Sequence, residues 1–347
     1  MRRHLNTLYI TTEGAWLSKD GENVVVSSEG KEIGRVPVHT IGGIVGFGRV
    51  LMSPQLMGHC AESDVGMSFM TEHGRFLARV VGPQSGNVLL RREQYRCADD
   101  EAACATIVRS LVVGKTVNQR AVLRRALRDH GDNMDQAMKS RLETVAERLT
   151  AIARKSENQM ILTDTLRGLE GEAGSLYFDV FDQLIRGDKD AFQFKGRSRR
   201  PPRDRVNAVL SFVYTLLAHD VRSALETVGL DPAVGFLHRD RPGRPSLALD
   251  IMEEFRPFFA DRLALSLINR RQLTARDFRA FENGAVMLTE EGRKSVLIAY
   301  QERKREELVH SFIQEKVTVG LTWHVQAQLL ARHLRGDIDG YPPFIWK

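Results

Sequence analysis

The stretch TLRGLEGEAGSLYFDVF, from Thr165 to Phe181, decides how the larger part of this chain folds. Its apolar residues recur at intervals of three and four, which predicts an amphipathic helix. On that helix Glu170 shares the apolar face with Ala173, Gly174, Tyr177, Phe178 and Phe181, whereas Glu172 lies on the opposite face. A carboxylate on an apolar face is costly to bury alone, so Glu170 requires a cation or a hydrogen-bond donor. That partner is either a metal ion or an arginine such as Arg167.

The same helical period extends in both directions from this stretch. Apolar residues at helical spacing begin near residue 87, and further helices are predicted at 134–160, 163–185, 205–227, 247–259, 290–314 and 325–335. The longest apolar run, VLSFVYTLLA at 209–218, is about half the length of a membrane span and predicts a buried helix. The start of the chain contains no signal peptide, so we expect a cytoplasmic protein.

Before residue 86 the pattern differs. Short segments rich in Val, Ile and Thr at 7–11, 24–27, 32–37, 43–46 and 75–81 predict strands, with one helix at 54–63. The expected fold is therefore α+β: a small β-rich, β-sandwich-like domain at 1–86 and a larger all-α catalytic, DNA-binding domain at 87–347. The length of 347 residues suits two domains. Three cysteines without a CxxC spacing make a disulfide framework or a structural zinc site improbable.

A second cluster of polar residues follows the segment GFLH, which ends at His238. The helix predicted from Ser246 stops before Pro257 and places Asp250 and Glu253 three positions apart, on one face. Taken singly, a solvated acid pair and a core histidine are the simpler interpretations. Together with Glu170, the carboxylates and the imidazole form an oxygen and nitrogen ligand set that suits Mg²⁺ or Mn²⁺.

The stretch KGRSRRPPRDR at 195–205 is strongly basic. Its proline pair forbids a helix, so we expect a loop. Its basic residues, set against the single acid Asp204, are Lys195, Arg197, Arg199, Arg200, Arg203 and Arg205. A solvated, mobile connection is one interpretation. The other, which the nearby acids favour, is that the loop binds the phosphates of a nucleic acid. The net charge of +6 is a weak indication in the same direction.

A metal site beside a basic loop suits phosphodiester chemistry. A divalent cation polarises the phosphate and stabilises the charge of the transition state, and arginines hold the flanking phosphates. The residues alone therefore predict a metal-dependent enzyme that acts on DNA.

Four ordered motifs also carry a family resemblance: RGLEGEAGSLYF, VNAVLSFVYTLL, GLDPAVGFLH and SLALDIMEEFRP. Together they resemble the CRISPR-associated integrase family of the adaptation module, Cas-one, over essentially the whole chain. The closing GYPPFIWK and the length are similar to its subtype I-C branch. The resemblance implies that Glu170, His238 and Glu253 are metal ligands and that Asp250 is a further acid needed for activity. Some members have aspartate where this chain has Glu253.

The resemblance also implies partners and a reaction. The partners are a second copy of the chain, bound through the β-rich domain, double-stranded DNA and the small protein Cas-two. The implied reaction inserts short foreign DNA fragments (spacers) into a CRISPR array, with no nucleotide cofactor. Three alternatives stay open: a structure-specific nuclease that cuts branched DNA, a non-catalytic DNA-binding scaffold, and a small-molecule metallohydrolase.

Overall fold

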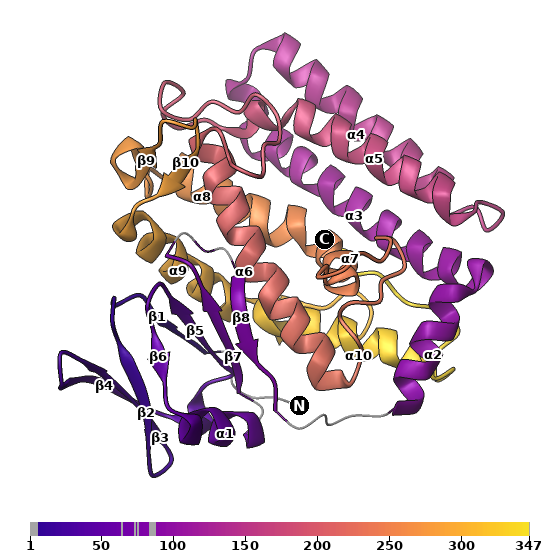
Figure 1. Ribbon diagram of the computed structural model, residues 1–347. Coiled ribbons are helices and arrows are strands. Elements are labelled where there is room, and N and C mark those ends of the chain that lie inside the picture. Colours follow the sequence, from indigo (N-terminus) through magenta and orange to yellow (C-terminus); the bar gives the residue numbers. More distant parts are fainter. Residues whose placement is uncertain (1–5, 64, 73, 75, 83–87, 347) are drawn as a thin grey trace.

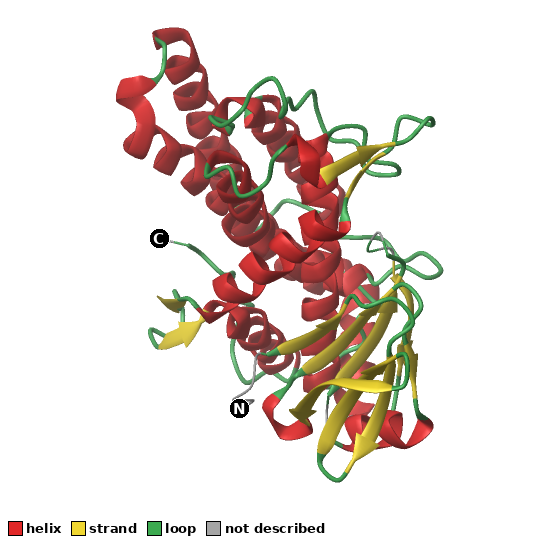
Figure 2. Cartoon of the chain, turned by 90° about the vertical axis from the view of Figure 1, so that its left-hand side faces the viewer, coloured by secondary structure: helices red, strands yellow, loops and turns green. Residues whose placement is uncertain are grey.

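Most of the strands gather at one end of the molecule, and helices make up most of the remainder (Figure 2). The computed structural model describes residues 6–63, 65–72, 74, 76–82 and 88–346. The β-rich region contains β1 (Thr7–Ile10), β2 (Trp16–Asp20), β3 (Asn23–Ser28), β4 (Lys31–Pro37), β5 (Gly43–Phe47), β6 (Leu51–Met52), α1 (Pro54–Glu62), β7 (Gly66–Met70) and β8 (Phe76–Val80).

These strands form two sheets of four, in the orders β1-β5-β7-β8 and β4-β3-β2-β6. In the first sheet β1, β5 and β7 are parallel, and β8 is antiparallel to β7. A parallel strand is normally covered on both faces, and every residue of β5 is buried. Ile44 of β5 belongs to a core shared with β2 and β3, whereas Val45 and Phe47 belong to the core of the helical region. This sheet therefore joins the two parts of the molecule.

The helical region follows residue 87. It contains α2 (Val88–Asp99), α3 (Glu101–His130), α4 (Gln136–Ser156), α5 (Thr163–Asp179), α6 (Arg205–Val228), α7 (Ser246–Phe255), the π-helical turn η4 (Arg256–Asp261), α8 (Arg262–Asn269), β9 (Phe278–Ala280), β10 (Val286–Leu288), α9 (Glu290–Arg305), β11 (Glu307–Val309), β12 (Lys316–Thr318) and α10 (Thr322–Leu334). The two hairpins β9–β10 and β11–β12 show that the expectation of an all-α second domain was wrong.

The predicted elements differ from the observed ones in several places. Strands β2, β6 and β7 were not predicted, and the helix predicted at 290–314 ends at Arg305, where the chain turns into β11. The helix predicted at 134–160 is α4, which ends at Ser156. Two predictions fall outside the described residues: the start of the last strand at residue 75 and the domain boundary at 86/87.

Helix α3 is the central scaffold of the helical region. It packs against α4, α5, α7 and η4, and α3, α4 and α5 lie side by side (Figure 1). Asp100 caps its start by accepting the backbone N–H of Ala103 at 2.8 Å. Glu101 accepts the N–H of Thr163, the first residue of α5, at 2.8 Å, which fixes α5 against α3. No helix of the described part of the chain is long and apolar enough to span a membrane. The run at 209–218 lies within the largely buried α6, and all three cysteines are free.

Candidate active site

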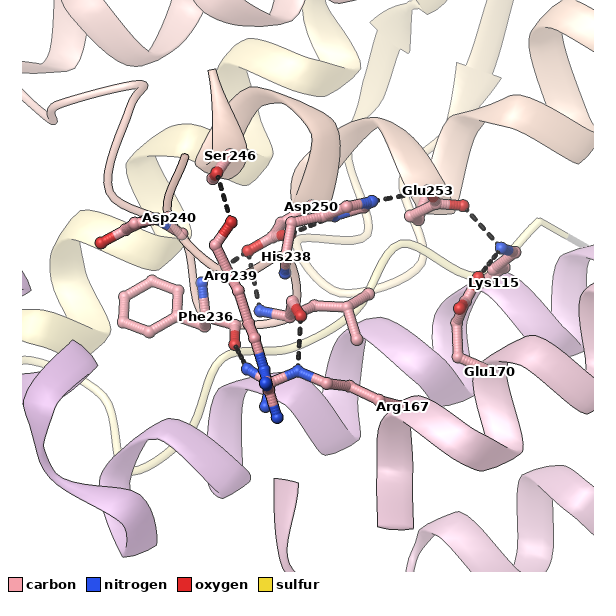
Figure 3. Close-up of polar contacts among 12 residues, drawn as sticks. Lys115, Arg167, Glu170, Phe236, His238, Arg239, Asp240, Ser246, Asp250 and Glu253 are labelled. Atoms are coloured by element: carbon pink, nitrogen blue, oxygen red, sulfur yellow. Dashed lines mark hydrogen bonds and ion pairs between the residues drawn. The ribbon is translucent and has the colours of Figure 1, made fainter. Parts of the chain in front are cut away.

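The predicted site residues meet beside α3 (Figure 3). Glu170 extends from α5, and its Oε1 forms an ion pair with the Nζ of Lys115 on α3. The Oε2 of Glu253, on α7, lies 2.7 Å from the same Nζ. The Nε2 of His238 lies 3.8 Å from Oε1 of Glu253. Three segments that are distant in the sequence therefore bring two acids and one imidazole to a single place.

Asp250 holds the loop that carries His238. Its carboxylate accepts the backbone N–H of Phe236 at 2.6 Å and those of Leu237 and His238 at 2.9 Å. It also lies 2.6 Å from Nδ1 of the His238 ring. In the neutral imidazole, a proton on Nδ1 that is donated to Asp250 leaves the Nε2 lone pair directed toward Glu253. Asp250 is fully buried and is saturated by these donors, so its role here is to orient His238.

Two further features keep this loop in place. A side chain at Gly235 would put its Cβ 2.8 Å from Oδ2 of Asp250, so the loop can approach α7 only with glycine there. Arg167, one turn before Glu170 on α5, donates to the carbonyl of Leu237 at 2.7 Å and to that of Phe236 at 2.9 Å. The suggestion that Arg167 neutralises Glu170 is wrong, because Arg167 binds this loop and Asp164 instead.

Glu253 is the most strongly held acid of the cluster. Its side chain is 1% exposed, and its Oε1 accepts from the guanidinium of Arg256, three residues later. Burial alone would raise the pKa of Glu253, but the charges of Arg256 and Lys115 outweigh that effect and hold it below its ordinary value. Burial likewise disfavours the charged form of Lys115, yet Glu253 and Glu170 raise its pKa. Within the cluster, Glu170 and Glu253 are therefore paired with internal cations.

Lys115 and Arg256 were missed by the sequence analysis. Lys115 follows the apolar run LVVG and precedes Thr116, so it is a charged residue within a buried stretch of helix. A buried charge is costly without a partner, so Lys115 needs an acidic partner just as Glu170 needs a cation or a donor. Arg256 comes three residues after Glu253, but Pro257 follows it. The prediction that the helix stops before Pro257 is correct only for its α-helical part, because the chain continues through the π-helical turn η4.

The donors suit a divalent cation by type, but their present arrangement does not hold one. Within the described residues, no group of three or more His, Cys, Asp or Glu side chains is arranged to bind a metal ion. The ammonium of Lys115 bonds to Glu170 and lies 2.7 Å from Glu253, so it occupies the space between these two carboxylates.

The basic loop divides into two groups of side chains. The side chains of Lys195, Arg199, Arg200 and Arg203 are exposed. Arg197 instead bonds to Asn207 and lies 5.0 Å from the ring centroid of Tyr214, and Arg205 donates to the carbonyl of Ala191 at 2.7 Å. Arg256 also lies 5.0 Å from the Tyr214 ring, so this tyrosine connects the root of the loop to the acid cluster. Four of the six predicted DNA-contacting residues face solvent and two are engaged internally.

Comparison with known proteins gives this fold and site a family. The family model described as CRISPR associated protein Cas1 matches residues 8–302. CRISPR-associated endonuclease Cas1 2 of Rhodospirillum rubrum is 58% identical over 347 residues, which cover all of both chains. The Cas1 protein TM1797 of Thermotoga maritima has the same fold, with a TM-score of 0.81 at 24% identity, covering 99% of this chain and 100% of that one. A casposase bound to an integration product also has a TM-score of 0.81, at 22% identity, covering 99% of this chain and 94% of the casposase. The match over most of the sequence and the identity along the full length show that this chain belongs to the Cas1 (Cas-one) family of CRISPR-associated proteins.

Proposed function

We propose that this protein is a divalent-metal-dependent DNA endonuclease and integrase that inserts short foreign DNA fragments into a CRISPR array. The observation that carries the proposal is the convergence of Glu170, His238 and Glu253 from three separate segments. Family membership supports the reaction class, because the R. rubrum relative is named an endonuclease. The exposed arginines of the loop favour a polyanionic substrate over a small molecule.

In the proposed reaction the 3′-hydroxyl of a fragment attacks a phosphodiester at the boundary of a repeat. A new bond forms between that oxygen and phosphorus, the bond from phosphorus to the 3′-oxygen of the repeat strand breaks, and the attacking proton is passed on to the leaving oxygen. The number of phosphodiester bonds is unchanged, so no nucleotide cofactor is needed. Mg²⁺ or Mn²⁺ would be held by Glu170, His238 and Glu253 and would stabilise the charge that develops on the phosphate.

The chain's own residues have separate tasks in this proposal. Asp250 keeps a proton on Nδ1 of His238, so that Nε2 remains a ligand. Arg256 neutralises Glu253 on the side away from Lys115. Lys195, Arg199, Arg200 and Arg203 hold phosphates of the DNA that flank the reacting bond.

The partners are proposed on the same basis: double-stranded DNA from the fragment and the repeat, the small protein Cas-two and a second copy of this chain. An exposed apolar pair supports dimerisation through the β-rich region. Trp16 and Leu51, which are paired across β2 and β6, are 43% and 58% exposed. Exposed apolar side chains that adjoin one another commonly mark a protein interface. The subtype I-C assignment rests on the closing GYPPFIWK and the length of the chain.

The function is tested by a joining assay. Purified protein, its small partner and Mn²⁺ are incubated with a labelled fragment and a supercoiled plasmid that carries the repeat. We expect covalent transfer of the label to the plasmid and near-complete loss of that transfer in Glu170→Ala, with DNA binding retained. The matched control is Glu172→Ala, two residues along the same helix, where the exposed carboxylate pairs with Arg148 at 2.8 Å. This control should join DNA normally.

The other outcomes of the assay identify the rival functions. Cutting of branched DNA without joining would favour a structure-specific nuclease that uses the same residues. Equal joining by Glu170→Ala and the native protein would point to a scaffold whose activity depends on another protein, and would contradict the proposed site.

A further inference from the structure

Lys115 occupies the centre of the acid cluster. It extends from α3, its side chain is 8% exposed, and its ammonium bonds to Glu170 while lying 2.7 Å from Glu253 (Figure 3). A lysine is seldom buried this deeply unless its charge is neutralised. Here two carboxylates on two other helices provide that neutralisation, so Lys115 cross-links α3, α5 and α7 through a single charged group.

The position of this ammonium coincides with the position that a bridging metal requires. A cation bound by both Glu170 and Glu253 would contact an oxygen of each, and one oxygen of each carboxylate now faces Nζ of Lys115. The other oxygen of Glu253, Oε1, already accepts from Arg256. A divalent ion and the ammonium would repel each other at this separation, so both cannot occupy the site together.

The surroundings allow the ammonium to leave. Lysine has a flexible four-carbon stem, so Nζ can move several ångströms without a change in the backbone of α3. The residue one turn beyond Glu170 on α5 is Gly174, and a methyl group added at that position would lie 3.9 Å from Nζ. The absence of a side chain at Gly174 leaves space beside the ammonium on the α5 side.

We propose that Lys115 is an internal counterion that substitutes for the divalent cation and is displaced when the metal binds. Its charge holds Glu170 and Glu253 together when no metal is bound and weakens metal binding, because the incoming ion must break two ion pairs. The proposal rests on the metal dependence of the proposed function. It assigns to Lys115 a role in setting metal affinity that is separate from contact with DNA.

The test compares Mn²⁺ binding by the native protein and by Lys115→Met, which keeps the length of the side chain and removes its charge. Isothermal titration calorimetry should show Mn²⁺ binding at least about tenfold tighter in the variant, which corresponds to about 1.4 kcal/mol. Thermal unfolding in EDTA should show a lower midpoint for the variant, because Glu170 and Glu253 then repel each other, and saturating Mn²⁺ should remove most of that difference. Lys115→Arg, which keeps the charge, should bind Mn²⁺ no more tightly than the native protein.

Lys294→Met is the matched control, since Lys294 lies on α9, outside the acid cluster. It should change neither the Mn²⁺ affinity nor the midpoint in EDTA. A second measurement covers the case in which Lys115→Met does not fold without metal. The native protein is crystallised with Mn²⁺, and Nζ of Lys115 should have moved out of contact with at least one of the two glutamates.

The contrary results are distinct. Mn²⁺ binding by Lys115→Met that equals or falls below native binding overturns the counterion role and leaves the proposed function intact. A bound Mn²⁺ with the ammonium still in contact with both glutamates does the same. Absence of Mn²⁺ binding in both the native protein and the variant overturns the metal dependence as well.

Discussion

The carboxylate of Asp250 makes more contacts than the other acids of the site, and none of them is to a lysine or an arginine. Three backbone N–H groups and one imidazole nitrogen surround it, all within 2.9 Å. Its role is therefore geometric: it folds the segment from Phe236 to His238 around its oxygens and determines which nitrogen of His238 is protonated. Glu253, one turn further along the helix, instead forms ion pairs with Lys115 and Arg256 and lies 3.8 Å from His238.

We predict that Asp250→Asn slows joining by about 10- to 100-fold and weakens Mn²⁺ binding by a similar factor. The amide group of asparagine presents N–H groups where the backbone donors require an acceptor, so the loop and the His238 tautomer lose their support. The rate of joining and the Mn²⁺ affinity are measured together. The control is Asp179→Asn at an exposed position of α5, which should change neither quantity. An unaltered Mn²⁺ affinity in Asp250→Asn would contradict the orienting role.

At the scale of single elements, the basic loop at 195–205 is held by buried contacts at residues 196–198 and exposes most of its other charged side chains. Asn207 is fully buried in α6 and bonds to Arg197, to the N–H of Ser198 at 3.1 Å and to the carbonyl of Gly196 at 2.8 Å. These contacts fix the start of the loop against α6. The charges that remain exposed are those that can meet phosphates.

We therefore expect Arg199→Ala, Arg200→Ala and Arg203→Ala, combined in one variant, to weaken binding of every DNA sequence alike. Each lost phosphate contact should reduce the slope of log affinity against log salt by about 0.9. Binding is measured by fluorescence anisotropy over a series of salt concentrations. Arg197→Ala is the contrasting variant, because it should lower stability instead, through its contacts with Asn207 and Tyr214. A salt slope that the triple variant leaves unchanged would exclude these three arginines from the DNA interface.

The closing segment of the chain is the second element with a structural role. Phe344 is 1% exposed and packs 5.0 Å from Phe255 and 5.2 Å from Phe258, measured between ring centroids. Its N–H donates to Glu254 at 3.0 Å, directly next to Glu253. Burial raises the pKa of Glu254 to about 8, although hydrogen bonds from Phe344, Tyr341 and Gln326 act to lower it. The C-terminal segment therefore covers the rear of α7 and supports the helix that carries the site.

Phe344→Ala should lower the free energy of unfolding by about 3–5 kcal/mol, because it leaves a cavity among aromatic rings. Urea unfolding followed by circular dichroism measures the change. Phe312→Ala is the matched control: Phe312 is 49% exposed, so its replacement should cost less than about 0.5 kcal/mol. Similar losses in the two variants would show that the C-terminal segment contributes little to the fold.

At the scale of the whole molecule, buried acids make the stability depend on pH, and Asp261 is one of them. Asp261 at the end of η4 accepts from Tyr214 at 2.5 Å, and burial raises its pKa from 3.8 to about 6. Between those values the unfolded chain has lost this proton and the folded chain has kept it. The folded state therefore binds more protons in that range, and the contribution of Asp261 to stability falls as the pH rises from about 4 to about 6.

Asp261→Asn removes this titration while keeping an oxygen that can accept from Tyr214. Relative to the variant, the native protein should lose stability from about pH 4 to about pH 6 and stay at a constant difference above that range. Urea unfolding of both proteins at several pH values measures the difference. Parallel stability curves across the whole range would show that the proton on Asp261 is not linked to folding.

The sequence by itself determined the helical period of 165–181, the β-rich start, the basic loop and the family resemblance. These features can be predicted because they depend on the local spacing of residues, on residue type or on the order of motifs along the chain. It also identified Glu170 as an acid that requires a partner, since a charge on an apolar stripe is visible from periodicity alone. It did not distinguish β2 and β7, the two-residue β6, or the hairpins β9–β10 and β11–β12, whose strands have three residues each.

Only the tertiary structure decided which group meets Glu170. Lys115 lies 55 positions before it in the chain, and their contact depends on how α5 is fixed against α3. The tertiary structure also determines the different partners of the two acids of α7: Asp250 binds the loop that carries His238, and Glu253 pairs with Lys115 and Arg256. The physical reason is the same in both cases: the energy of a buried charge depends on groups brought near it by packing, and sequence spacing specifies such neighbours only within one helix or strand.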